Sequence, residues 1–283
     1  MNIVKVSIVI PVFNTENYLA DSINSILHQT LEEIEIVVVN DGSTDRSAQI
    51  LEEFAQKEKR MRILSHECNR GLSEARNSGI REARGEFIYL FDSDDILERD
   101  CLELCYHKSK TEALDFLFFD AVTFSDSSVK TSFHPNYLRT GALVSKVYAG
   151  IDILELLMSN NGYKDSVCLN FIQMSYLERL NLSFVPGIYY EDVLFTLHLY
   201  IEATRVGFIN RSFFHRRIRV NSIMMNMRMK NIIDMLFIIR EIQRYKKTQP
   251  ERVKKLLNKK SRSMLLFILK KVLTFEFLIK TNN

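Results

Sequence analysis

The chain of 283 residues is long enough for one large α/β domain with a small extension, and its 46% hydrophobic residues allow a sizeable core. The charged fraction of 26% is ordinary for a folded protein and excludes a chain that is disordered throughout. The net charge of +3 is unevenly spread: residues 244–283 carry twelve Lys or Arg and two acids, a balance of +10, which leaves −7 for the rest. A basic tail on an acidic body predicts an anionic partner for the tail.

The cysteines and the N-terminus exclude further classes of protein. The four cysteines show neither CxxC spacing nor a pairing with histidine, so we expect no zinc site, reduced thiols and a cytoplasmic protein. The short apolar run at the N-terminus is followed by Pro11 and Asn14, which predicts a buried strand and not a signal peptide. No uncharged stretch reaches about 18 residues, so no transmembrane helix is expected.

Apolar strands and helices alternate along the first 120 residues. We expect strands at 6–13, 35–40, 62–66, 86–91 and 115–120, and helices at 16–29, 45–59, 72–83 and 97–110. This order predicts an α/β fold with a mainly parallel central sheet and helices on both faces.

The pattern from residue 121 onward is less regular. We expect helices at 151–160, 170–180 and 191–203, a strand pair within 206–220, and helices from 227, ending in a basic amphipathic stretch at 251–279. This organisation suggests one domain over 1–222, with halves 1–120 and 121–222, and a helical extension over 223–283.

Three polar clusters follow predicted strands and should meet at one edge of the sheet. They are Pro11 to Asn14, the NDGSTD segment at 40–45, and the DSDD segment at 92–95. Ligands of open α/β sheets bind outside the carboxyl ends of the strands. Asp41 could therefore accept hydrogen bonds from a ligand, although NDGSTD also fits a strand–turn–helix junction with no further role.

The DSDD segment places three carboxylates after the apolar run GEFIYLF. Closely spaced carboxylates repel one another, and a hard divalent cation such as Mg²⁺ or Mn²⁺ would neutralise that repulsion, with a phosphate-bearing substrate supplying further oxygens. Capping of the next helix would explain one or two of these acids but not three. A glycosidase pair needs carboxylates about 5–9 Å apart, which neighbours on one loop rarely provide. The metal–phosphate interpretation is favoured.

Three later clusters also carry candidate chemistry. Arg76, within NRGLSEARNSG, could bind phosphate, although the neighbouring arginines also fit a solvated helix face. Glu191 and Asp192 open an apolar helix, either as capping residues or with one carboxylate as a general base. His215, in HRRIRVNS, could be a metal ligand, although a lone histidine on a strand is more often structural.

Taken in order, SIVIPVFN, VVVNDGSTD, NRGLSEARNSG, GEFIYLFDSDD and YYEDVLF resemble the motifs of the inverting family-2 glycosyltransferases of bacterial polysaccharide or lipooligosaccharide type, which have the GT-A fold. The resemblance is strong over about residues 3–110 and weaker to 222. It implies a nucleotide-diphospho-sugar donor and Mn²⁺ or Mg²⁺. It also implies metal-dependent transfer of a hexose-type sugar to a hydroxyl of a glycan or a lipid-linked acceptor.

The same resemblance assigns roles to individual residues. The base pocket would be lined by Pro11 and Phe13, with Asn14 beside them and Asp41 on the base. The diphosphate would lie near Arg76 and Ser93. Asp94 would bind the metal, Asp92 would serve both donor and metal, and His215 would be a further metal contact. Asp192 would be the general base with Glu191 next to it, and Asp95 is expected to cap the following helix.

Processive members of this family carry a Trp-containing motif and transmembrane helices. This chain contains no Trp, so transfer of a single sugar is expected. Two other classes stay open: a sugar-1-phosphate nucleotidyltransferase, which normally shows a Gly-rich N-terminal loop with Arg, and an inactive binding protein of the same fold.

The stretch 251–279 mixes leucines with cations, which suits a helix lying on an anionic membrane. We therefore expect a peripheral protein on the inner face of the cytoplasmic membrane, engaged in synthesis of a capsule, a lipopolysaccharide or a similar surface polysaccharide. The alternative is a helix packed on the domain with its lysines outward. No nucleic-acid partner is expected, because aromatic and basic residues are not interleaved.

Overall fold

The computed structural model describes residues 4–125, 135–139, 143–219 and 228–281, with side chains to residue 273. The strands are β1 (Val6–Val12), β2 (Ile34–Asn40), β3 (Met61–Ser65), β4 (Phe87–Leu90), β5 (Ile96–Leu97), β6 (Phe116–Ser125), β7 (Asn170–Gln173) and β8 (Val206–Ile218). The helices are α1 (Glu16–Leu27), α2 (Ser47–Ala55), α3 (Leu72–Glu82), α4 (Cys101–Thr111), α5 (Gly150–Ser159), α6 (Met174–Leu180), α7 (Asp192–Ile201), α8 (Met229–Lys246) and α9 (Glu251–Thr281), with a 3₁₀ turn at Val167–Leu169.

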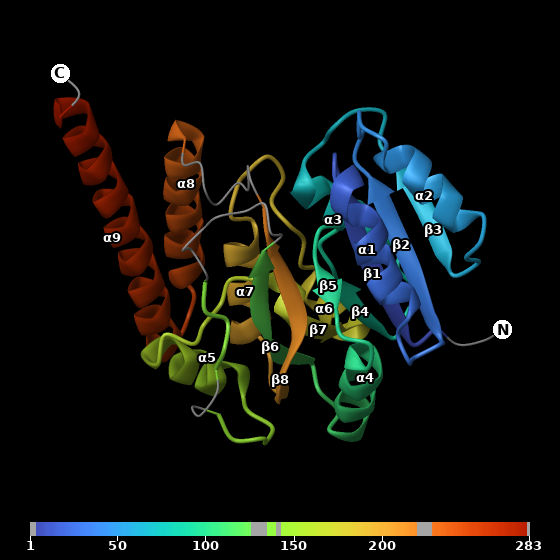
Figure 1. Cartoon of the computed structure of the whole chain (residues 1–283). Coiled ribbons are helices and arrows are strands. Elements are labelled where there is room, and N and C mark those ends of the chain that lie inside the picture. Colours follow the sequence, from blue (N-terminus) through green and yellow to red (C-terminus); the bar gives the residue numbers. More distant parts are fainter. Residues whose placement is uncertain (1–3, 126–134, 140–142, 220–227, 282–283) are drawn as a thin grey trace.

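The strands form one sheet in the order β3-β2-β1-β4-β7-β6-β8-β5 (Figure 1). Strands β3, β2, β1 and β4 are parallel, as the β-α alternation predicts. Beyond them β7 is antiparallel to both β4 and β6, β6 and β8 are parallel, and β5 is antiparallel to β8. The sheet is therefore mixed, and its parallel part is the half that the first 90 residues build.

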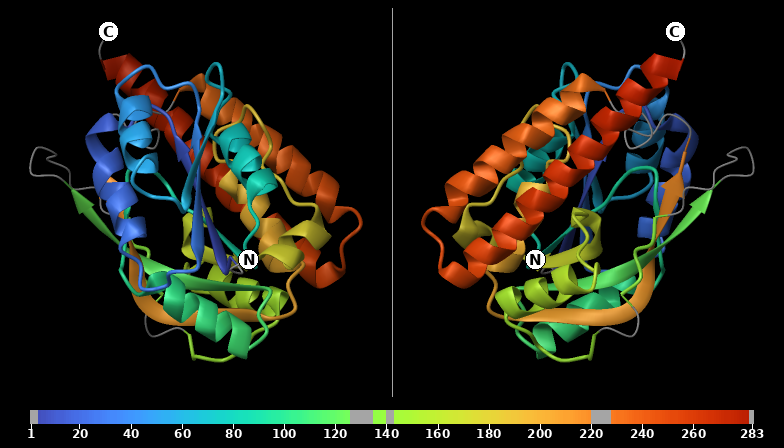
Figure 2. Two further views of the ribbon diagram at one scale, coloured as in Figure 1. Left: turned by 90° about the vertical axis from the view of Figure 1, so that its right-hand side faces the viewer. Right: turned by 90° about the vertical axis from the view of Figure 1, so that its left-hand side faces the viewer.

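The chain reverses its direction across the sheet between β3 and β4. Helices α1 and α2 lie on one face of the parallel strands, and α3 lies on the other (Figure 2). Right-handed crossovers require this change of face when the strand order turns back past β1. Such a reversal opens a crevice at the carboxyl ends of β1 and β4. Gly79 lets α3 approach β1, because a Cβ there would lie 2.2 Å from Val9 Cγ1.

The long strand β8 curves around the second half of the sheet (Figure 2). Its register against β6 shifts on either side of Asp120, so that Phe119 pairs with Ile209, Asp120 with Ser212 and Ala121 with Phe214. A bulge of this kind bends the strand. The bend carries the end of β8 to β5, where His215 lies opposite Ile96.

Four sequence-based expectations about these elements were wrong in detail. Residues 170–173 form β7, and the helix begins at Met174. Residues 206–218 form one long strand and not a strand pair. Residues 96–97 form β5, and the next helix begins at Cys101. The last turns predicted for the second helix are absent, since α2 ends at Ala55. For the three strands, pairing with a strand far along the chain determined the secondary structure. For the second helix, a short loop replaced its last turns.

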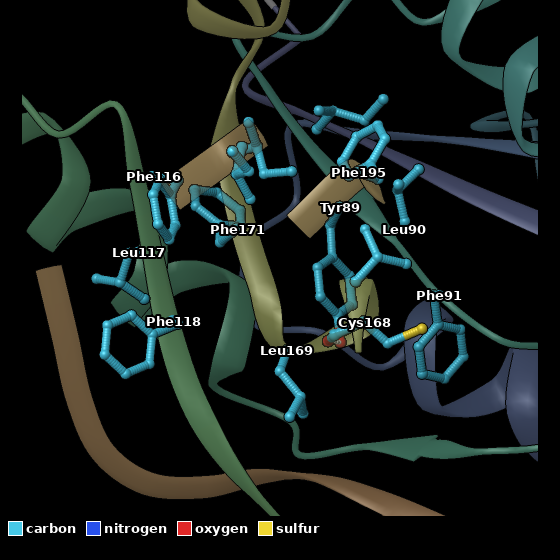
Figure 3. Packing of buried hydrophobic residues seen from close by; sticks show 14 of the residues in the cluster. Tyr89, Leu90, Phe91, Phe116, Leu117, Phe118, Cys168, Leu169, Phe171 and Phe195 are labelled. Carbon is cyan, nitrogen blue, oxygen red and sulfur yellow. Dashed lines mark hydrogen bonds between the residues drawn. The ribbon is translucent and has the colours of Figure 1, made fainter. Parts of the chain in front are cut away.

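The core lies between the sheet and its helices and is rich in aromatic side chains (Figure 3). All four residues of β4 are buried, and Phe87 stacks on Phe171 of β7 with ring centroids 5.0 Å apart. The Tyr89 hydroxyl donates to the Cys168 carbonyl oxygen at 2.8 Å, so this buried polar group is paired. These contacts join the two halves of the sheet into one core.

Helices α8 and α9 form an antiparallel hairpin beside the sheet (Figure 1). Val253, Leu256 and Leu257 of α9 are buried, so the first part of the predicted membrane-facing stretch packs on the domain instead. Within the described residues, no helix is both long enough and apolar enough to cross a membrane. The proposed boundary at residue 222 lies outside the described residues.

Candidate active site

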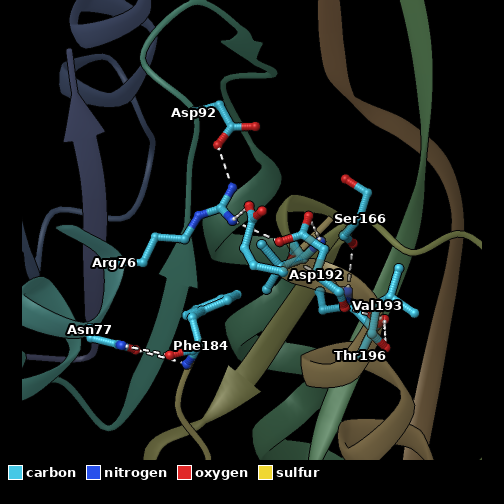
Figure 4. Close-up of polar contacts among 11 residues, drawn as sticks. Arg76, Asn77, Asp92, Ser166, Phe184, Asp192, Val193 and Thr196 are labelled. Atoms are coloured by element: carbon cyan, nitrogen blue, oxygen red, sulfur yellow. Dashed lines mark hydrogen bonds and ion pairs between the residues drawn. The ribbon is translucent and has the colours of Figure 1, made fainter. Parts of the chain in front are cut away.

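One buried arginine joins three carboxylates from two distant parts of the chain (Figure 4). Arg76 of α3 donates through Nη1 to Glu191 and to Asp192, each at 2.7 Å, and through Nη2 to Asp92 at 2.9 Å. Its side chain is 2% exposed, and its Nε has no hydrogen-bond partner. The structure thus brings together Arg76, Asp92, Glu191 and Asp192, four residues to which the family resemblance assigns roles in one site.

Helix α3 also holds the segment that leads to Glu191. The Asn77 side chain donates to the Phe184 carbonyl oxygen and accepts from the Phe184 N–H, both at 2.9 Å. The Phe184 ring lies 5.1 Å from the Arg76 guanidinium and stacks on Phe195 of α7 at 4.2 Å. Two neighbouring residues of α3 therefore fix where α7 begins.

Asp192 is held at the first turn of α7. One carboxylate oxygen accepts from Arg76 and the other from the Val167 N–H at 3.2 Å. Burial raises the pKa of Asp192 to about 7; Arg76 opposes this rise, whereas Glu191 and Asp92 add to it. A carboxylate with a pKa near neutrality suits a general base.

Three neighbouring carboxylates keep the Arg76 guanidinium protonated. Burial disfavours the guanidinium, but the carboxylates of Asp192, Asp92 and Glu191 raise the pKa of Arg76 above its ordinary value. Because its Nη atoms are engaged by carboxylates here, its predicted contact with a diphosphate stays a prediction.

The DSDD loop, residues 92–95, lies beside this cluster. Asp92 binds Arg76, and Ser93 accepts a hydrogen bond from the Thr15 hydroxyl at 3.2 Å. Asp94 pairs with Arg219 at 2.7 Å. Burial raises the pKa of Asp94, Arg219 opposes the rise and Asp92 adds to it. The loop is therefore tied to the start of α1, to α3 and to the segment after β8.

Asp95 does not cap the following helix as expected. Its carboxylate is buried and accepts a hydrogen bond from the Arg217 N–H at 2.7 Å, while Arg217 Nε donates to the Asp94 carbonyl oxygen at 3.0 Å. Burial, followed by Asp94 and Asp92, raises the pKa of Asp95 well above its usual range. The bend in β8 is what delivers Arg217, so the sequence near Asp95 held no signal for this contact.

The carboxylates of Asp92 and Asp94 fit a divalent cation that takes its other ligands from the substrate and water. Among the residues that the structure describes, no group of three or more His, Cys, Asp or Glu could hold a metal ion. Mg²⁺ and similar ions are often held by one or two carboxylates together with substrate phosphates and water. Asp92 and Asp94 can supply two carboxylates of that kind, although Asp94 is paired with Arg219 here.

His215 has a different partner. Its Nε2 lies 2.7 Å from a carboxylate oxygen of Glu98, just after β5, and both side chains are about one third or more exposed. No described cluster joins His215 to Asp92 and Asp94. The predicted metal contact of His215 is therefore unsupported by the structure and stays a prediction.

The predicted base-pocket residues lie at the ends of β1 and β2. Pro11 follows the last β1 residue that pairs with β4, so its missing N–H leaves no bond unmade there. Phe13 is exposed, and Asn14, at a φ of 52°, accepts from the Thr44 N–H at 2.8 Å. Asn14 thereby fixes the two loops against each other.

Asp41 organises the loop after β3. It is 2% exposed, and its carboxylate accepts from the N–H groups of Arg70 and Gly71 at 2.9 and 2.8 Å. His66 Nδ1 lies 2.6 Å from the same carboxylate, and His66 Nε2 lies 3.0 Å from the Ser78 hydroxyl. The predicted contact between Asp41 and a nucleobase stays a prediction.

Sequence reasoning missed His66, Asn77 and the Val167 N–H. The position of His66 at the end of a predicted strand, on the same edge as Asp41, was an available signal. The roles of Asn77 and Val167 depend on contacts across more than twenty residues and left no local pattern.

Comparisons with known proteins agree with this geometry. Residues 7–169, more than half of the chain, match the family model described as glycosyl transferase family 2. The chain therefore belongs to family 2 of the glycosyltransferases.

Several curated proteins are similar over most of the chain. Glycosyltransferase GlyA of Streptococcus pneumoniae is 34% identical over 77% of this chain and 31% of its own length. Glycosyltransferase GlyG of the same organism is 30% identical over 77% of this chain and 72% of its own length. The cholesterol galactosyltransferase of Borreliella burgdorferi is 30% identical over 77% of this chain and 61% of its own length. The chain thus spans 31% of GlyA and well over half of the other two.

Solved structures share the fold. S. aureus TarS 1-349 in complex with UDP-GlcNAc superposes with a TM-score of 0.69 at 23% identity, over 84% of this chain and 66% of that one. The mannosyltransferase PcManGT of Pyrobaculum calidifontis, in complex with GDP-Man and Mn²⁺, gives 0.60 at 16% identity, over 91% and 69%. The fold is GT-A-like, a curled mixed sheet with helices and a helical C-terminal region.

Proposed function

We propose that this protein is an inverting glycosyltransferase that moves one sugar from a nucleotide-diphospho-sugar to an acceptor hydroxyl. The observation that carries the proposal is the Arg76 cluster. It places the acid of a donor-binding loop, Asp92, and a carboxylate of raised pKa, Asp192, on the same guanidinium. An inverting transfer needs both functions within reach of one anomeric carbon.

The donor would lie across the carboxyl ends of β1, β2 and β4. Its base would stack near Phe13 and reach Pro11, Asn14 and Asp41, and its diphosphate would lie over Ser93 and the DSDD loop. A UDP-sugar is the first choice, because TarS, a protein of the same fold, is described with UDP-GlcNAc. PcManGT, described with GDP-Man, makes GDP-sugars the second.

Asp192 would accept the proton of the acceptor hydroxyl as its oxygen attacks the anomeric carbon, and the bond to the diphosphate would break on the opposite face. Glu191 and Arg76 would hold Asp192 in position. A Mn²⁺ or Mg²⁺ ion held by Asp94 and Asp92 would supply stabilisation of the leaving diphosphate.

The acceptor would be a glycan or a lipid-linked saccharide in cell-surface polysaccharide synthesis, of the capsule or lipopolysaccharide type. The cholesterol galactosyltransferase among the relatives supports a lipid-borne hydroxyl as one option. An acceptor of this kind would place the enzyme at the inner face of the cytoplasmic membrane.

The test is to incubate the purified chain with UDP-, GDP- and dTDP-sugars, with Mn²⁺ or with chelator, and to measure release of nucleoside diphosphate. Metal-dependent release with one donor class supports the proposal. Formation of nucleotide-sugar from a sugar 1-phosphate and a nucleoside triphosphate would instead identify a nucleotidyltransferase. Donor binding by calorimetry without turnover, with acceptor extracts present, would identify a binding protein.

A further inference from the structure

The far end of the α8–α9 hairpin exposes apolar side chains on both helices. Gln243 donates to Ser261 at 2.8 Å and Lys246 to Asn258 at 2.9 Å, and both pairs fit one antiparallel register. In that register the first turns of α8 lie level with residues 268–275 of α9. We call residues 229–238 and 264–273 the hairpin tip.

Each helix of the tip has one buried and one exposed apolar stripe. Met235, Ile238, Met264 and Ile268 are buried. The exposed stripe consists of Met229 (70%), Ile233 (58%), Leu236 (47%), Leu266 (59%), Leu269 (56%) and Leu273 (63%). A helix of a globular protein normally turns only one apolar stripe inward, so a second, exposed stripe marks an interaction surface.

The charge at the tip identifies the kind of partner. In α9 the tip contains Lys270 and Lys271, both exposed, and no acid, and the exposed Arg262 lies just before it. In α8 the charge of Lys230 is balanced by Asp234 at 2.8 Å. A second copy of the chain would bring two cationic surfaces together, which costs free energy. Leucines interleaved with cations match the boundary between the headgroups and acyl chains of an anionic bilayer.

On the side opposite the exposed stripe, the first turns of α8 contact residues 187–190, which lead into the proposed catalytic acids. Asp234 accepts from the Tyr189 N–H at 2.8 Å, Lys230 donates to the Gly187 carbonyl oxygen at 2.8 Å, and Asn231 donates to the Tyr190 hydroxyl at 3.1 Å. Glu191 follows directly. A surface that covers the outer stripe of α8 would therefore lie about one helix diameter from residues 187–190, which lead into Glu191.

We propose that the hairpin tip is a docking surface for a bilayer of anionic phospholipid and that docking presents the active site to acceptors in that bilayer. The second half of this statement rests on the proposed function, whereas the first does not. Each leucine buried in the bilayer would favour docking through the apolar surface that it removes from water. Each cation near the anionic headgroups would favour it further.

The experiment is co-sedimentation of the full chain with vesicles of phosphatidylcholine, with or without about 30% phosphatidylglycerol. We expect binding only to the anionic vesicles. Leu269→Ser/Leu273→Ser should weaken it at least tenfold, because two apolar anchors are lost. The matched control Leu104→Ser/Leu138→Ser removes two exposed leucines elsewhere and should bind as the unmodified chain does.

Equal binding to both kinds of vesicle, or an unchanged affinity of the Leu269→Ser/Leu273→Ser variant, would overturn the proposal. A dimer that this variant converts to a monomer without a change in vesicle binding would show that a second copy covers the tip. No donor is needed for sedimentation. A chain that docks but transfers no sugar therefore refutes only the proposed function, and one that transfers sugar without docking refutes only this inference.

Discussion

Two buried arginines in this molecule have opposite surroundings. Arg139, 3% exposed, faces one carboxylate, Asp120 at 3.1 Å, and donates to the carbonyl oxygens of Phe119 and Gly162 at 2.7 and 3.0 Å. Arg76 is as deeply buried, but it faces three carboxylates and leaves its Nε without a partner.

The difference is the one expected between a structural ion pair and the site proposed above. The charges of Arg139 and Asp120 balance, and Arg139 Nε and Nη1 donate hydrogen bonds within the protein. A bound ligand would therefore supply no missing interaction. Around Arg76 negative charge is in excess, and a proton or a cation must neutralise it. Excess charge of one sign is costly for folding alone, which is why it is found where a ligand binds.

The largest effect should come from removing the base beside Arg76. Asp192→Asn keeps the shape and can still accept one of the two hydrogen bonds from Arg76 and the Val167 N–H, but it cannot act as a base, so transfer should fall about 10²- to 10⁴-fold. Donor affinity by calorimetry should remain, since the donor-binding residues are untouched. Near-normal turnover of this variant would remove Asp192 from the mechanism.

The two arginines should differ most clearly in stability. Arg139→Met leaves Asp120 buried and unpaired, so the free energy of unfolding should fall by about 3–5 kcal/mol. Arg76→Met should cost less stability, because Asp92 and Asp192 are about one fifth exposed and can bind protons. Urea unfolding of both variants measures this.

If Arg76→Met proves the more damaging of the two, the contrast drawn between the pairs is wrong. Transfer by Arg76→Met should be lost in either case, whereas any correctly folded Arg139→Met protein should retain it.

The rate of transfer should depend on pH through Asp192. Burial raises its pKa to about 7, with Glu191 and Asp92 adding to the shift and Arg76 opposing it. Only the deprotonated form can act as the base. The rate should therefore fall about tenfold per pH unit below 7 and level off above it. Initial rates at saturating donor give the profile, and a rate that stays constant down to about pH 5 would contradict it.

The smallest effect is expected at His215. Its exposed pair with Glu98 contributes at most about 1 kcal/mol, so His215→Ala should change neither stability nor the Mn²⁺ requirement appreciably. Asp94→Ala is the matched comparison and should abolish metal-dependent donor binding. A His215→Ala variant that needs much more Mn²⁺ than the unmodified chain would restore His215 as a metal ligand.

Local sequence signals predicted the parallel strands β1 to β4 and their helices, because buried parallel strands are continuous apolar runs such as VSIVIPV. They also placed Asp92 in a loop at the edge of the sheet and Asp192 at the start of a helix. Local signals failed at β5, β7 and β8, which are two to thirteen residues long. These strands form by pairing with strands far along the chain. For the same reason the sequence did not predict that Arg217 holds Asp95.

The contacts of Arg76 with residues far along the chain limit how the chain can be divided into fragments. Its partners Glu191 and Asp192 are 115 and 116 positions away, and β4 pairs with β7 from the second half. A fragment ending near residue 120 would leave Arg76 with Asp92 as the one remaining partner of its three carboxylates, and β4 would be an open sheet edge. The two predicted halves, residues 1–120 and 121–222, should therefore form a single cooperative unit, and we expect that neither can be exchanged between relatives as an independent module.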